Sequence, residues 1–547
     1  MKLRLRVVGF LTVAAGLVLT AQPHREPDKS ELHKQAVAES LVPIRPGVPS
    51  KTPFWNNYAR RFNYAPAFDF KKTPGAAYYR FTAQARDGAH SFEAEVPWAP
   101  LTPIWAKLPV GKVTLKVEGL NKKGGSVVGP SGDKTFYRST VFNGPYLKPV
   151  VSYHESARLS LRALFLKPEI QSWVREGKPD PAYNLNCYPA KVMGATVLGM
   201  TLYAKLATDE GHAANALLAA RRAADFLIGL SEPAGRPLEY FPPTYWDGVK
   251  PGRHPVFIDR TMMHYPADAA LGYLDLYDRT HDDKYFQAAR RIAETYRKTQ
   301  LPSGVWPLVA NVKTGEAIGP NLLVPTLPIM LMDRLVGQYN LKEYKPVAER
   351  AFQWTMQNPV KRFNWDAQFE DSKPVEPYVN LAREQACDVA IRLLKLNAAD
   401  PKSVALAEEL LHFAEDQFVV WEPPRPEWKE IVYLGCNPDG DISSWLTPVV
   451  LEQYRCYGPV ARSVAIMMSA WEAAYKVTRN ELYRAKADSL ANSLTVAQQF
   501  WGGGTYPTWI RKTEGENWLN NTVHTSRMML EFADSSAPAG HSGRANP

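Results

Sequence analysis

Residues 265–296 read YPADAALGYLDLYDRTHDDKYFQAARRIAETY. Apolar and small residues recur at the spacing of one helical face in both halves of this stretch. The first half carries Ala267, Ala270, Leu271 and Leu274, and the second half carries Tyr285, Ala289, Ile292 and Tyr296. A short polar turn separates the halves, so the stretch predicts a helical hairpin whose small alanines let neighbouring helices approach closely.

The same hairpin pattern recurs along the chain, which is typical of a repeat architecture. Thr280, Tyr285 and Ala289 have the same offsets as Thr478, Tyr483 and Ala487, and Tyr339, Tyr344 and Ala348 repeat the spacing again. Further helix pairs are predicted around Thr208 with Ala223, around Asn397 with Ala407, and in the segment that ends at Phe532. About six hairpins therefore fill residues 150–535. Six hairpins that close into a ring form a mainly α (α/α)6 toroid, with a short tail at 536–547 expected to be disordered.

The N-terminal part has a different character. A basic start with Lys2, Arg4 and Arg6 precedes an apolar run over 7–19, which is too short to span a bilayer and predicts a signal peptide at 1–21. Residues 22–50 are polar and contain several prolines, as in a linker. Short alternating segments with hairpin turns over 51–145 predict a small, fibronectin-like β-sandwich.

The composition and charge of the chain indicate which kind of partner it binds. The 547 residues carry a formal net charge of +10, which favours an anionic partner. The basic residues are dispersed and match no nucleic-acid motif, so an anionic polysaccharide fits an exported protein better than nucleic acid does. No segment after the predicted signal peptide is apolar for long enough to be an integral membrane helix. The expected location is therefore secreted or periplasmic, and the oligomeric state stays open.

The sequence lacks the motifs that mark several classes of metal site and cofactor site. The four cysteines form no CxxC pair, which disfavours structural zinc, and the chain has neither an HExxH motif nor a Walker loop. We therefore expect neither a metal nor a cofactor. Cys436 and Cys456 could form a disulfide in an oxidising compartment, or they could be buried thiols.

The richest candidate site is the loop NWDAQFED at 364–371. Glycoside hydrolysis needs two carboxyl groups, one protonated and one ionised, and an aromatic environment raises the pKa of a carboxyl group. Asp366, Glu370 and Asp371 supply such a pool, and Trp365 could stack against a sugar ring. Solvated acids at the start of a helix would give the same pattern.

The second candidate, DRTMMHYP at 259–266, precedes a predicted inner helix. Arg260, with Asp259, could bind a substrate carboxylate, and His264 or Tyr265 could act as a base or an acid. A purely structural helix start would also place these residues here.

A third set of candidates combines aromatic residues with an acid. Trp246 and Trp306 could stack against sugar rings, with Glu239 as a reserve acid, or these proline-rich loops could pack their aromatics inward. Arg383 could bind substrate, although it could equally form a local ion pair with Glu384. His524 is a lone histidine that favours a structural role. Glu415 and Asp416, late in a predicted helix, fit an exposed surface.

The order of export signal, β-sandwich and helical hairpins resembles the toroidal carbohydrate-active enzymes. The Thr–Tyr–Ala hairpin pattern and the loop LPSGVWP at 301–307 resemble the unsaturated uronyl hydrolases and related bacterial β-glucuronidases. That resemblance implies an acid on a loop of Trp-x-Asp-Asp type. The nearest match is Trp365-Asp366 with Glu370-Asp371, whose spacing departs from the pattern.

These observations predict a glycoside hydrolase, resembling a β-glucuronidase, that acts on uronic-acid-containing polysaccharide or oligosaccharide. A polysaccharide lyase is the alternative, because Arg260, His264 and Tyr265 suit β-elimination. A metal-free uronate epimerase and a non-catalytic glycan-binding protein are further alternatives.

Overall fold

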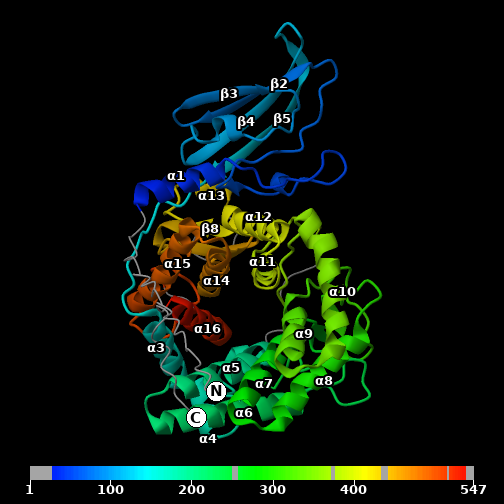
Figure 1. The fold of residues 1–547 in the computed structure, drawn as a ribbon, viewed down its shortest axis with the longest axis vertical. Coiled ribbons are helices and arrows are strands. Elements are labelled where there is room, and N and C mark those ends of the chain that lie inside the picture. Colours follow the sequence, from blue (N-terminus) through cyan, green and yellow to red (C-terminus); the bar gives the residue numbers. More distant parts are fainter. Residues whose placement is uncertain (1–27, 249–256, 371–375, 433–440, 514–516, 537–547) are drawn as a thin grey trace, which may run out of the picture.

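The computed structural model describes residues 28–248, 257–370, 376–432, 441–513 and 517–536. The predicted signal peptide at 1–21 lies outside the described residues, as does the predicted tail at 536–547 apart from Ser536, which ends the last helix. Figure 1 shows a ring of helices with a β-sheet standing on one side of it. In the described part of the chain, no helix is long and apolar enough to cross a membrane.

The ring consists of six inner helices, each paired with an outer helix. The inner helices are α5 (Pro189–Leu206), α7 (Tyr265–Thr280), α9 (Thr326–Tyr339), α11 (Glu384–Leu396), α14 (Ala461–Thr478) and α16 (Leu519–Ser536). Their outer partners are α6 (Glu210–Leu230), α8 (Asp283–Thr299), α10 (Lys345–Thr355), α12 (Pro401–Phe418), α15 (Glu481–Phe500) and α3 (Tyr153–Phe165). A short additional helix, α4 (Pro168–Arg175), packs against α6.

The inner helices close into a ring because each packs against the next and α16 packs back against α5. Five of the hairpins join consecutive helices. The sixth joins α16 to α3, from the two ends of the helical region. The predicted six-hairpin toroid is confirmed.

The repeated sequence pattern corresponds to a repeated hairpin turn. His281 and Arg479 end the inner helices in the left-handed conformation, with φ of 53° and 57°. The next residues, Asp282 and Asn480, cap the following outer helices through their side chains. The repeated spacing of Thr, Tyr and Ala therefore corresponds to one compact turn followed by a helix whose Tyr and Ala are buried.

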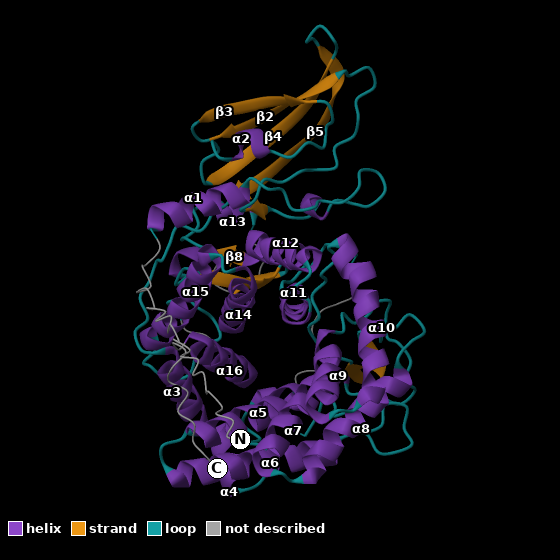
Figure 2. Cartoon of the chain, viewed as in Figure 1, coloured by secondary structure: helices purple, strands orange, loops and turns teal. Residues whose placement is uncertain are grey.

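The N-terminal strands form one five-stranded sheet rather than the two facing sheets of the predicted sandwich. Its order is β1 (Arg61–Phe62), β5 (Ser126–Arg138), β4 (Gly111–Leu120), β2 (Tyr78–Ala85) and β3 (Gly88–Ala94). Only β1 and β5 are parallel. Figure 2 shows this sheet beside the short helix α2 (Thr102–Trp105).

A second sheet is not needed because aromatic side chains cover the buried face. Phe136 of β5 contacts Phe62, Phe68 and Trp105, with ring centroids 5.6, 5.9 and 6.1 Å apart. These rings bury the alternating apolar residues of the strands. The β-rich region predicted for 51–145 is thus present, with a helix and an aromatic segment in place of the second sheet.

Part of the predicted linker is ordered. Residues Lys29–Ser40 form helix α1, capped by Asp28, which packs against α15. Its last turn carries Glu39, whose carboxylate lies 2.5 Å from the Nζ atom of Lys486 on α15. Lys486 also contacts Glu415 of α12 at 2.7 Å. Residues 29–40 are therefore not a flexible linker. They form a helix that the Glu39–Lys486 ion pair attaches to the ring.

Glu415 and Asp416 are buried, not exposed. Asp416 accepts hydrogen bonds from the backbone N–H groups of Asn63 and Tyr64, so it fixes the start of the sheet region on α12. Burial raises the pKa of Asp416 to about 7. These two acids hold the N-terminal region on the ring.

Two small β-sheets lie in the described loops between hairpins. Strand β6 (Arg260–Met262) pairs with β7 (Val309–Asn311), while β9 (Val449–Gln453) pairs with β8 (Val419–Val420) and β10 (Cys456–Pro459). These loops lie at the end of the ring where the inner helices begin, and they position part of the site described below.

Candidate active site

A cavity of about 280 Å³ lies where the six inner helices begin. Each inner helix contributes to its lining near its N-terminus: Lys191 from α5, Tyr265 from α7, Thr326 from α9, Glu384 from α11, Arg462 from α14 and Asn520 from α16. Helix N-termini carry partial positive charge and unpaired N–H groups. The site therefore gathers six such ends, which favours negative groups in a ligand.

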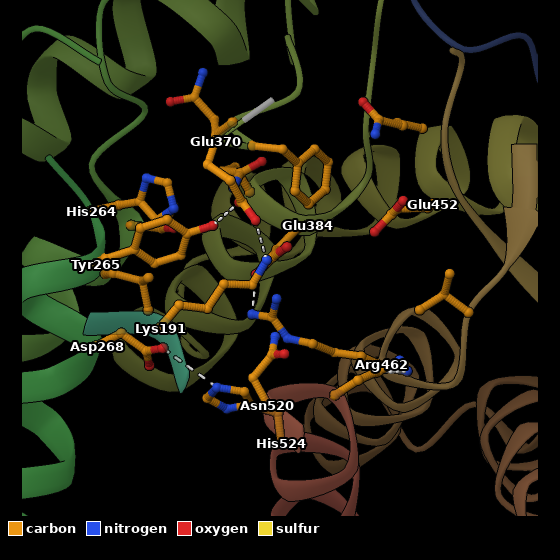
Figure 3. Close-up of a pocket in the computed structure, with 18 of the residues that line it drawn as sticks. Lys191, His264, Tyr265, Asp268, Glu370, Glu384, Glu452, Arg462, Asn520 and His524 are labelled. Atoms are coloured by element: carbon orange, nitrogen blue, oxygen red, sulfur yellow. Dashed lines mark hydrogen bonds and ion pairs between the residues drawn. The ribbon is translucent and has the colours of Figure 1, made fainter. Parts of the chain in front are cut away.

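One group of side chains centres on Glu370. Its Oε1 atom lies 2.5 Å from Nζ of Lys191, and its Oε2 atom accepts a short hydrogen bond from the hydroxyl of Tyr265. Figure 3 shows both donors converging on this carboxylate. Burial would raise the pKa of Glu370, but Lys191 and Tyr265 outweigh burial and lower it to about 2. The carboxylate is thus ionised and satisfied by two donors.

Lys191 is surrounded by aromatic rings. Its Nζ atom lies 5.7 Å from the ring centroid of Tyr188, 5.8 Å from that of Tyr265 and 5.9 Å from that of Trp518. These rings stabilise the ammonium group and restrict its position. Lys191 therefore presents its charge toward Glu370 from a defined position.

His264 lies beside this group, immediately before α7, with its ring 3.9 Å from that of Tyr265. Its buried Nδ1 atom has no hydrogen-bond partner among the described residues. Burial lowers the pKa of His264 to about 4, although Glu370, Glu384 and Asp268 oppose this shift. The imidazole is neutral at pH 7 and has the protonation state of a base.

A second imidazole lies on α16. The Nε2 atom of His524 lies 3.4 Å from Oδ2 of Asp268 on α7. Burial would raise the pKa of Asp268, but His524 outweighs burial and lowers that pKa to about 2. The ionised Asp268 carboxylate therefore faces the His524 imidazole across the cavity lining.

The buried Arg383 and the half-buried Arg462 form another part of the lining. Arg462 is paired with Glu384, and Nη1 of Arg383 donates to the backbone oxygen of Glu452 at 2.5 Å. The Nε atoms of both arginines have no hydrogen-bond partner among the described residues. Burial would raise the pKa of Glu384, but Arg462 outweighs it, so the carboxyl group stays ionised.

The remaining lining suits a polar ring compound. The indoles of Trp509 and Trp518 lie 5.6 Å apart at their centroids, and amides from several elements accompany them. The amide side chains are those of Gln368, Gln385, Gln453, Asn520 and Asn521. Indole faces and amides together are the groups that contact the C–H faces and hydroxyl groups of a sugar.

Four of the sequence-predicted site residues line the cavity: Glu370, His264, Tyr265 and Arg383. They come from three separate stretches of sequence that the fold brings together. Asp371 lies outside the described residues. Asp366 does not line the cavity, although burial raises its pKa to about 6 and its Oδ2 atom accepts a hydrogen bond from Asn364.

The predicted stacking roles of Trp306 and Trp365 are wrong. Both side chains are fully buried, and the Nε1–H of Trp306 donates to the backbone oxygen of Tyr296 at 3.0 Å. Both loops pack their indoles inward, which the inward-packing alternative anticipated for Trp306 but not for Trp365. Trp246 is half-buried, packs edge-on against Phe226, and does not line the cavity.

Three further predicted residues lie outside the cavity lining. Asp259 pairs with Lys313 at 2.9 Å, and Glu239 pairs with Lys298 at 2.8 Å. The guanidinium of Arg260 lies over the ring of Phe257, 4.7 Å from its centroid. Arg260 points to an aromatic neighbour rather than to the Lys191–Glu370 group, so a role in binding the substrate at this cavity is not supported.

Sequence reasoning missed or undervalued the residues that stand alone in the sequence: Lys191, Asp268, Glu384, Arg462 and His524. Each lies within the first two turns of an inner helix. The available signal was their position just after the start of successive predicted inner helices, since such ends meet on one side of a toroid.

Among the described residues, no group of three or more His, Cys, Asp or Glu side chains could hold a metal ion. Cys456 lines the cavity, while Cys436 lies outside the described residues.

Comparison with known proteins gives similarity of structure only. No family model matches the sequence, and no curated protein matches it. A family 76 glycoside hydrolase from a bovine Bacteroides thetaiotaomicron strain has 9% identity and a TM-score of 0.46, with 84% of this chain and 93% of that chain covered. A cellobiose 2-epimerase from Spirochaeta thermophila has 13% identity and a TM-score of 0.44, covering 70% and 97%.

An unsaturated glucuronyl hydrolase specific for heparin has 11% identity and a TM-score of 0.41, covering 70% of this chain and 98% of that chain. Similarities of this size do not indicate the activity of this chain. The function has to be inferred from the cavity itself.

Proposed function

We propose that this protein is an enzyme that acts on a carbohydrate bearing a carboxylate, that is, a uronic-acid-containing oligosaccharide or polysaccharide. The observation that carries the proposal is the cavity, where a neutral imidazole lies beside an ammonium–phenol pair. Indoles and amides suited to a sugar ring complete the lining. Burying so many charged groups is costly to folding, and such clusters are enriched at functional sites.

The chemistry that these groups support best is removal of the proton next to the carboxylate. His264 accepts the proton from C5 of the uronate, and the electron pair of that C–H bond forms a C4–C5 double bond. The C4–O bond breaks, and the departing oxygen takes a proton from His524. This β-elimination produces one unsaturated sugar and one new reducing end.

The C5 proton becomes acidic enough to remove when donors in the site neutralise the negative charge of the adjacent uronate carboxylate. Lys191 and Tyr265 lie beside His264, and the Nε atoms of Arg383 and Arg462 are donors without partners among the described residues. A site that neutralises the carboxylate stabilises the negative charge that develops as the proton leaves.

Glycoside hydrolysis is the second candidate. It is favoured by the four carboxyl groups of the lining, Asp268, Glu370, Glu384 and Glu452, which come from four different elements. Hydrolysis needs one carboxyl group in its protonated form. Asp268, Glu370 and Glu384 all have lowered pKa values, so they fit the role of base or nucleophile better than that of acid.

A panel of uronate-containing glycans tests the proposal, with ultraviolet absorbance and reducing ends measured together. Both signals rising in equal amounts would support elimination, whereas reducing ends without absorbance would support hydrolysis. His264→Gln should abolish the absorbance change. His154→Gln, which alters an exposed histidine of α3, should leave it unchanged. Neither signal from any glycan would overturn the proposal of a glycan-cleaving enzyme.

A further inference from the structure

Glu370 occupies the cavity in an unusual way for a loop residue. Its two carboxylate oxygens are taken by donors from two different inner helices, Lys191 of α5 and Tyr265 of α7. Only 10% of the Glu370 side chain is exposed, and 18% of that of Lys191. The carboxylate therefore fills a two-donor site that is built by the ring and not by its own loop.

The backbone around Glu370 is anchored independently of its side chain. The hydroxyl of Tyr245 donates to the backbone oxygen of Glu370 at 2.8 Å. Earlier in the loop, the N–H of Ala367 donates to the backbone oxygen of Asn380 at 2.8 Å, and the side-chain Oε1 atom of Gln368 accepts from the N–H of Val324 at 3.0 Å. The Glu370 side chain can change rotamer while these contacts persist.

Lys191 and Tyr265 together have the chemistry of a carboxylate-binding site. An ammonium group and a phenol each take one oxygen, so that a carboxylate bridges the two donors. Three aromatic rings around the ammonium restrict it to this position. A ligand carboxylate placed here would lie next to His264.

Glu370 already takes both donors, so a ligand carboxylate can make the same two contacts only if the Glu370 side chain moves away. We propose that Lys191 and Tyr265 form the subsite for the substrate's uronate carboxylate, and that Glu370 fills this subsite in the unliganded protein and is displaced when substrate binds. This rests on the proposed function as far as the substrate class is concerned. Glu370 then acts as an internal competitor that weakens the binding of anionic sugars and leaves the binding of neutral sugars unaffected.

The test is the binding of glucuronate and of glucose, its neutral counterpart, measured by calorimetry. Glu370→Gln keeps the size of the side chain but weakens its hold on Lys191 and Tyr265. We expect Glu370→Gln to bind glucuronate ~10-fold or more tightly than the wild type, with glucose binding unchanged. Adding Lys191→Met to Glu370→Gln should remove the gain.

The matched control is Glu239→Gln, which removes the same charge from a residue paired with Lys298 outside the cavity lining. Its glucuronate binding should equal that of the wild type. Adding Tyr265→Phe to Glu370→Gln gives an independent reading, since it removes one donor and should weaken glucuronate binding relative to Glu370→Gln without affecting glucose. Circular dichroism of each variant checks that it is folded.

Equal or weaker glucuronate binding by Glu370→Gln, or an equal gain for glucose, would overturn the inference. These measurements need no turnover. Absence of glycan cleavage with the expected binding pattern would remove the proposed reaction and leave the subsite in place. Glycan cleavage without the expected binding pattern would remove the proposed subsite and leave the proposed reaction in place.

Discussion

The carboxylate of Asp268 lies 3.4 Å from the imidazole of His524, although their helices, α7 and α16, lie on opposite sides of α5 in the ring. The contact is possible because α5 carries glycines where its neighbours press against it. A Cβ atom at Gly194 would meet the backbone of Ala269 at 3.3 Å, and one at Gly199 would meet Val523 at 2.5 Å. Close packing around α5 thus brings the acid and the imidazole together.

Replacing Asp268 by Asn should destabilise the protein in a pH-dependent way. The pKa of Asp268 is about 2 in the folded protein, below its ordinary value of 3.8, so its ionised form stabilises the fold. That contribution, about 2 kcal/mol, is present above pH 4 and lost as the pH falls toward 2. Melting temperatures of wild type and variant should differ at pH 7 and converge near pH 2. A constant difference at all pH values would contradict the pairing with His524.

His264→Gln should lower kcat by about 10²- to 10⁴-fold with little change in KM, because it removes the proposed base but not the binding groups. In the wild type the base is active when neutral. The acid limb of the rate profile should therefore rise with pH through the His264 pKa of about 4. A pH–rate profile between pH 3 and 8 checks this. An acid limb near pH 6.5, the ordinary histidine value, would assign the base to another residue.

The hairpins could be predicted because their signals are local. The spacing of Thr280, Tyr285 and Ala289 reflects one turn and one helix, and the structure contains that turn. The pairing of α16 with α3 could not be predicted in this way, since it joins segments more than 350 residues apart. The second sheet was wrongly predicted because alternating strands demand a covered face but do not specify what covers it.

The site was harder to predict because most of it consists of single residues near helix starts. Glu370, His264 and Tyr265 stood in chemically rich stretches, so they were found. Lys191 and His524 have no unusual neighbours in sequence, and only closure of the ring places them together. Aromatic content alone was misleading, as the buried indole of Trp306 shows.

Replacing Lys486 by Met should cost about 3–5 kcal/mol of stability, because it leaves Glu39 and Glu415 buried without their shared cation. Since Glu39 belongs to α1, the variant should also release that helix and speed proteolysis near residues 41–50. Melting temperature and limited proteolysis measure the two effects. Lys345→Met, which removes an exposed ion pair with Glu349, is the control and should change neither. Unchanged proteolysis in Lys486→Met would mean that other contacts hold α1.

Gly199→Ala tests whether close packing against α5 positions the site. The added methyl group would lie 2.5 Å from the rigid Val523 side chain of α16, which should cost about 1–3 kcal/mol. Moving α16 outward also carries His524 away from Asp268, so turnover should fall even at temperatures where the variant is fully folded.

Gly229→Ala is the matched control, because a Cβ atom at this exposed position of α6 meets nothing within 4 Å. It should stabilise the protein by up to about 1 kcal/mol through helix propensity and leave turnover unchanged. Adding Val523→Ala to Gly199→Ala removes the clashing methyl groups and should restore part of both stability and turnover. Recovery of stability without recovery of turnover would show that the position of α16 does not control the His524–Asp268 pair.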